Sequence, residues 1–118
     1  MSNGVPIWKD ANSSSGGSVE AVESVTRIIK GEVNSSGNVV SGVGFTANKN
    51  GSNDYIITFN QSFSEKPVVV SNLVSGSPRY FTTEIKSITT NSVIIKVIDP
   101  INGAIMTGGF TFIVMGTK

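Results

Sequence analysis

Hydrophobic and polar positions alternate along short stretches of this chain, as they do in half-buried β-strands. In the segment DYIITFN, Tyr55, Ile57 and Phe59 share one face, and the intervening residues share the other. This period of two predicts a strand that directs Tyr55, Ile57 and Phe59 towards a core. Four other phenylalanines are expected to contribute to the core or to an interface: Phe45, Phe63, Phe110 and Phe112.

The same pattern recurs along most of the chain and predicts an all-β fold. The predicted strands are Thr26–Asn34, Gly44–Lys49, Tyr55–Asn60, Pro67–Leu73, Phe81–Ile88, Ser92–Ile98 and Phe110–Met115. Segments rich in Gly, Asn, Ser and Pro separate them, and two Asn-Gly pairs supply the positive φ that tight turns need. Short strands separated by such turns are typical of an antiparallel β-sandwich or jelly roll.

The N-terminal segment has a different composition from the rest. Residues 1–18 end in ANSSSGGS, which is typical of flexible coil, and the one tryptophan lies ahead of it in VPIW. This segment is either a flexible tail or a peptide that anchors the chain to a parent particle through Ile7 and Trp8. Residues 19–25 predict a short neck, helical or extended, since their valines keep a helical spacing only briefly. The β-sandwich domain is then expected to cover residues 26–118.

Three predicted strands are apolar on both faces, at Val68-Val69-Val70, Val93-Ile94-Ile95 and Ile113-Val114-Met115. A sandwich strand normally has one face in the core and one in water. The second apolar face belongs either to strand ends that loops cover or to a contact with other copies of the chain. Charged residues make up only 14% of the chain, against about 25% in average domains. This low charge favours a contact with other copies.

Composition also limits the chemistry that the chain can perform. The 118 residues suit one domain, and the absence of Cys and His removes disulfides, thiolate metal sites and the commonest general base. The carboxylates are scattered singly, so a glycosidase pair arises only if folding brings Asp54 and Asp99 together. We therefore expect no enzymatic activity, no metal and no cofactor. The oxygen-rich segment NGSND at Asn50–Asp54 superficially suits calcium, but it is equally typical of a turn, which we favour.

Charge and hydropathy argue against two classes of partner. The formal net charge is +1, so nothing indicates binding to nucleic acid. No apolar run approaches the roughly 18 residues of a membrane span, so we expect no membrane insertion. The N-terminus MSNGVPIWKD lacks the basic-then-apolar layout of a secretory signal.

The segment GEVNSSGNVVSGVGFT, followed by DYIITF, FSEKPVVV and the closing FTFIVMG, carries a resemblance to a known family. It resembles the small trimeric β-domains that end phage tail fibres, prophage appendages and bacterial collagen-like proteins. The resemblance covers Arg27 to Gly116. It implies a homotrimeric jelly roll, similar in shape to the head domains of complement-type and tumour-necrosis-factor-like trimers.

The resemblance also implies a location and two functions. The location is a virion, a phage tail or an extracellular surface appendage. One function is a fibre-tip, receptor-binding domain that recognises a polysaccharide or protein on a cell surface by multivalent binding. The alternative is a trimerisation or capping module that binds no external ligand.

Candidate ligand-binding residues lie around the turn SGSP. Arg79 and Tyr80 follow this turn, and together with Asn72 they offer the aromatic, charged and amide groups that typically hold sugars. The alternative is that Tyr80 packs at the end of the sandwich and that Arg79 is solvated.

Overall fold

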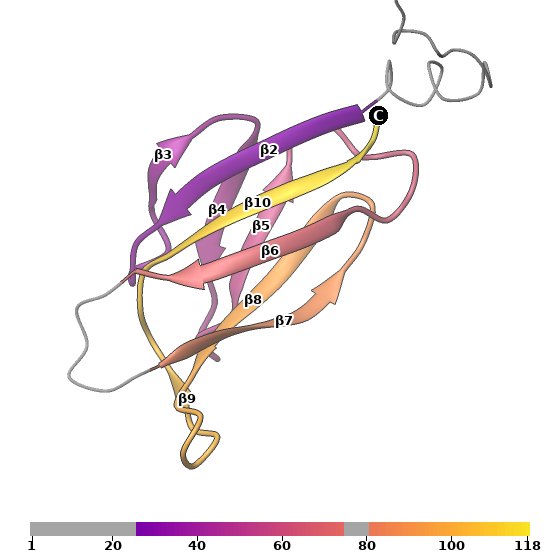
Figure 1. Cartoon of the computed structure of the whole chain (residues 1–118). Helices are drawn as coiled ribbons and strands as arrows, with labels where there is room; N and C mark the ends of the chain where they lie inside the picture. Colours follow the sequence, from indigo (N-terminus) through magenta and orange to yellow (C-terminus); the bar gives the residue numbers. More distant parts are fainter. Residues whose placement is uncertain (1–25, 75–80) are drawn as a thin grey trace, which may run out of the picture.

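The computed structural model describes residues 26–74 and 81–118, which form two antiparallel β-sheets and contain no helix (Figure 1). The first sheet, here the β2–β10 sheet, has the strand order β3 (Val39–Gly42), β2 (Thr26–Val33), β10 (Phe110–Thr117) and β6 (Val68–Leu73). The second, here the β5–β8 sheet, has the order β4 (Phe45–Lys49), β5 (Tyr55–Phe59), β8 (Ser92–Ile98) and β7 (Thr82–Ile88), and β9 (Ile105–Met106) pairs with β8.

Each of the seven predicted strands is present, which confirms the all-β, sandwich-like prediction. Two further strands, β3 and β9, were not predicted. β3 is exposed along its whole length, so it shows no alternation, and β9 has only two residues. The predicted tail of residues 1–18, the neck of residues 19–25, and the anchor residues Ile7 and Trp8 lie outside the described residues.

The core lies between the two sheets and consists of the inward side chains of alternating strands. Tyr55, Ile57 and Phe59 are all buried on one face of β5, as the alternation predicts. The four other phenylalanines expected in the core are also buried. Phe45 packs edge-on against Phe112 with ring centroids 4.9 Å apart, and Tyr55 packs edge-on against Phe110 at 5.2 Å. These pairs join the β5–β8 sheet to the β2–β10 sheet.

Both ends of the described chain lie at the same end of the sandwich. Thr26, at the start of β2, is paired with Thr117, near the end of β10. Arg27 closes this end, because its guanidinium lies 4.0 Å from the centroid of the Phe63 ring and donates to the carbonyls of Gln61 and Ser62. Any segment attached before residue 26 therefore joins the domain at this end.

The opposite end carries the turns at residues 34–38 and 50–54 and the β8–β9 hairpin, which extends beyond the sheets in Figure 1. The buried hydroxyl of Tyr55 donates to the Ser35 carbonyl at 2.7 Å and accepts from the Gly108 N–H at 3.2 Å. Burial raises the pKa of this phenol, so it keeps the proton that it donates. One side chain thus ties two connecting segments to the core.

Candidate functional site

The outward face of the β2–β10 sheet carries apolar side chains on three neighbouring strands. The register places Met115 between Ile28 and Val68, and it places Ile113 between Lys30 and Val70. We call the five apolar residues Ile28, Val68, Val70, Ile113 and Met115 the outer apolar face. Their exposed fractions range from 47% to 67%. Of the inward residues on these strands, Ile29 and Val114 are buried and Val69 is partly buried, so the strands alternate in exposure but are apolar on both sides.

The outward face of the β5–β8 sheet is polar by comparison. Its exposed strand positions include Thr46, Asn48, Thr58, Thr82, Glu84, Lys86 and Ser87. Of the apolar residues on that side, Ile56, Ile94 and Ile98 are partly exposed, and Ile105 on β9, the register partner of Ile98, is 44% exposed. The two outward faces of the sandwich therefore differ, because the β2–β10 face has five exposed apolar side chains on three neighbouring strands, whereas the β5–β8 face has mostly polar exposed positions.

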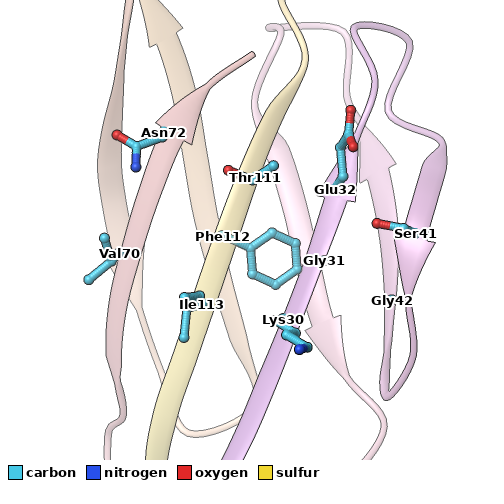
Figure 2. Close-up of a pocket in the computed structure, with 10 residues that line it drawn as sticks. All are labelled: Lys30, Gly31, Glu32, Ser41, Gly42, Val70, Asn72, Thr111, Phe112 and Ile113. Atoms are coloured by element: carbon cyan, nitrogen blue, oxygen red, sulfur yellow. The ribbon is translucent and has the colours of Figure 1, made fainter.

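An open hollow of about 450 Å³ crosses the outward face of the β2–β10 sheet. Figure 2 shows that its lining comes from all four strands of this sheet. Val70 and Ile113 form an apolar part, and Gly31, Gly42 and Phe112 also line the hollow. A polar row of Ser41, Glu32, Thr111 and Asn72 borders the hollow on one side.

The charged side chains that line the hollow are Lys30 and Glu32, two residues apart on β2. They point to the same side of the sheet because side chains on a strand repeat with a period of two. A face with one cation and one anion is neutral overall and matches a second copy of itself better than it matches a strongly charged partner.

The strand β3 forms the edge of this sheet and is also apolar. Val39 and Val40 are exposed on it, and Val43 follows at the turn into β4. Val43 is 85% exposed, the largest value among the large hydrophobic residues that the structure describes. The flanking Gly42 and Gly44 have φ of 105° and 94°. These conformations suit glycine and turn the chain sharply, so Val43 lies at the tip of the turn.

The predicted ligand-binding residues divide between described and undescribed segments. Asn72 lies on β6, where its side chain lines the hollow (Figure 2). Arg79 and Tyr80 lie outside the described residues, so their grouping with Asn72 stays a prediction. The segments that are apolar on both faces of a strand indicated Val70 and Ile113 as candidates for a contact surface. No sequence signal indicated Lys30, Glu32 or Val43, because only the strand register brings them to one face.

The two acidic turn residues, Asp54 and Asp99, make different contacts. Asp54 is buried, and it pairs with Lys86 at 2.9 Å from a bulge in β7. The hydrogen bond from Lys86 lowers the pKa of Asp54. Burial acts in the opposite direction and raises this pKa, whereas the hydrogen bond from Asn50 and the charges of Lys86 and Lys96 lower it further. Asp99 accepts a hydrogen bond from the Ile101 N–H within the β8–β9 turn.

The segment Asn50–Asp54 forms a turn, as the sequence interpretation favoured. The side chain of Asn50 accepts hydrogen bonds from the backbone N–H groups of Ser52 and Asp54. Asn53 has a positive φ of 61°. In residues 26–74 and 81–118, no group of three or more His, Cys, Asp or Glu side chains is arranged to hold a metal ion.

No known protein family, curated protein or solved structure matches this chain significantly. Within the part of the chain that the structure describes, no helix has the length and apolar character needed to cross a membrane.

Proposed function

We propose that this chain is a non-enzymatic, homotrimeric domain at the tip of a fibre in a phage or phage-derived particle, where it binds a cell-surface ligand. The observation that carries the proposal is the outer apolar face, which lies on one sheet only. The resemblance of Arg27–Gly116 to trimeric fibre-tip domains supplies the biological setting and the number of copies.

The outer apolar face supports self-association for a physical reason. Five large apolar side chains in contiguous positions on three strands form a patch that soluble monomers rarely leave exposed. Obligate interfaces commonly bury 2,000 Å² or more and resemble a divided protein core. Covering this face with other copies of the chain removes the patch from water.

The proposal assigns the two ends of the sandwich different roles. The end that holds Thr26 and Thr117 faces the particle, because the preceding segment enters there. The opposite end carries the turns at residues 34–38 and 50–54 and the β8–β9 hairpin, and it is the natural surface for a receptor. Three such ends on one axis bind a repetitive cell surface with avidity that one copy lacks.

Sedimentation equilibrium of the full chain at micromolar concentration tests the assembly. The chain mass is 12.4 kDa, so a trimer has three times this mass, about 37 kDa. A single species near 37 kDa is the expected result. A monomer near 12 kDa contradicts the proposal.

Binding to a glycan array and to whole cells or cell walls tests the receptor function. We expect specific binding that the substitutions Arg79→Ala and Tyr80→Ala abolish while the trimer mass stays unchanged. A trimer that binds no tested surface contradicts the receptor function and favours a trimerisation or capping module.

A further inference from the structure

We propose that the β3 edge of one copy packs against the outward face of the next copy, and that Val43 enters the hollow lined by Val70 and Ile113. This inference rests on the proposed trimer and names the contact that holds it together. Each copy contributes a projection to one neighbour and a hollow to the other.

Both parts of the proposed contact, the exposed Val43 and the hollow, are present on one molecule. Val43 is the most exposed large hydrophobic residue within residues 26–74 and 81–118, and it lies at the tip of a turn between two glycines. The hollow of about 450 Å³ has an apolar part that accommodates a valine side chain. Gly42, the chain neighbour of Val43, also lines this hollow, so the contact is head-to-tail when Val43 of one copy reaches the apolar part of the next copy's hollow at Val70 and Ile113.

The edge strand β3 has no charge or proline that would protect it from pairing with another chain. An exposed edge strand with apolar side chains is prone to pair or aggregate unless charges, prolines or a partner protect it. β3 has the sequence VVSG, with Val39 and Val40 exposed and no charged residue. At the other side of this sheet, β6 is linked to β7 by a hydrogen bond of 2.8 Å between Ser71 Oγ and Thr83 Oγ1. The β3 edge is therefore the one that a neighbouring copy most needs to cover.

Packing of the β3 edge of each copy on the outward face of the next copy closes a ring when the copies are related by a rotation. A head-to-tail contact between identical chains gives a closed ring when successive copies are related by a simple rotation, which is 120° for a trimer. Each copy then offers Val43 to one neighbour and its hollow, which Ser41 and Gly42 of β3 also line, to the other. The Lys30 and Glu32 side chains that line the hollow leave the contact neutral, so no copy meets a net charge of its own sign.

Disulfide trapping tests this contact without interference, because the chain has no cysteine. The test uses the full chain with Val43→Cys and Val70→Cys combined, and each single variant as control. Within one copy the two positions are separated by three strand spacings, roughly 14 Å, whereas a disulfide needs Cα atoms closer than about 7 Å. Any disulfide between the two introduced cysteines therefore joins different copies.

The expected product after oxidation of the double variant is a covalent trimer on a non-reducing gel. In a ring, each chain is joined to both neighbours, so the trimer is linked throughout. The single variants give at most covalent dimers. Covalent dimers alone from the double variant, in protein that is trimeric before oxidation, overturn the head-to-tail ring.

A charge substitution gives an independent result. Val43→Asp is expected to weaken the trimer at least about 100-fold in sedimentation equilibrium, because it would move a charged carboxylate out of water and against Val70 and Ile113 in the apolar part of the hollow. Ile101→Asp is the matched control, because Ile101 is 83% exposed but lies in the β8–β9 turn at the far end of the sandwich. This control is expected to remain trimeric.

The outcomes separate the inference from the proposed function. A wild-type trimer that persists in Val43→Asp overturns the edge-to-face contact and leaves the trimeric fibre domain standing. A wild-type monomer overturns both. Loss of the trimer in Val43→Asp, its retention in Ile101→Asp and a covalent trimer in the double cysteine variant support the contact.

Discussion

Gly42→Ala is expected to be one of the most destabilising glycine-to-alanine substitutions in the described part of the chain. The φ of Gly42 is 105°, a conformation that residues with a Cβ atom rarely adopt. A Cβ atom there would also overlap the Lys30 carbonyl oxygen and lie 2.8 Å from Gly31 Cα. Both neighbours are backbone atoms, so neither can move aside by changing a side-chain rotamer.

The expected loss for Gly42→Ala combines these two effects. The positive φ costs about 1–2 kcal/mol for a residue other than glycine. Inserting a carbon into closely packed surroundings costs a further 1–3 kcal/mol or so. We therefore expect the free energy of unfolding to fall by about 2–5 kcal/mol.

Two other glycines separate these contributions. Gly103 has a φ of 72° but open space around a Cβ atom, so Gly103→Ala should lose only the conformational part, about 1–2 kcal/mol. Gly51 has open space and no positive φ, so Gly51→Ala should change stability by less than about 1 kcal/mol. Urea melts measure the free energy of unfolding of each variant. All melts use the same protein concentration, because the stability of an oligomer depends on concentration. Equal losses for Gly42→Ala and Gly103→Ala would refute the close backbone packing beneath the β3–β4 turn.

Three further predictions concern the core and its polar groups. Phe59→Ala should lower the free energy of unfolding by about 3–5 kcal/mol in urea melts, because the ring is buried against Phe63, and a loss below about 1 kcal/mol would contradict the assignment of faces on β5. Tyr55→Phe should lower the free energy of unfolding by about 1–3 kcal/mol, because the Ser35 carbonyl and the Gly108 N–H each lose a hydrogen bond inside the protein. An unchanged urea melt would contradict this role of the Tyr55 hydroxyl. Since the folded-state pKa of Asp54 lies below 3.8, its ionised form stabilises the fold fully above that pH and loses this effect as the pH falls through the folded value. Asp54→Asn should therefore flatten the acid limb of a stability-against-pH curve, and an unchanged limb would contradict the link to Lys86.

The strands and the core were predictable because alternation is a local signal. Tyr55, Ile57 and Phe59 repeat with a period of two, and their burial follows directly from that spacing. Ser92–Ile98 matches its predicted bounds although Val93-Ile94-Ile95 is apolar on both faces, because turn residues flank this strand on both sides. β3 escaped prediction because it buries no side chain, so burial leaves no periodic trace in its sequence.

The candidate site was only partly predictable because it depends on pairing between distant strands. Consecutive apolar residues identified Val70 and Ile113 as unusual, but the sequence did not show that they are register partners. Lys30 and Glu32 approach them only because β2 pairs with β10. The Gly42-Val43-Gly44 turn contains glycines that resemble those of any loop, and its importance comes from the hollow beside it.

The most direct test of the account is the mass of Ile113→Asp in sedimentation equilibrium, measured beside the wild type and Thr58→Asp. Ile113 lies on the outer apolar face, whereas Thr58 is an exposed residue inside a strand on the polar outward face of the other sheet. The account predicts a trimer of about 37 kDa for the wild type and Thr58→Asp, and a 12.4 kDa monomer for Ile113→Asp. A trimeric Ile113→Asp, or a wild type that is monomeric at micromolar concentration, would contradict the claim that copies of this chain meet through the outer apolar face.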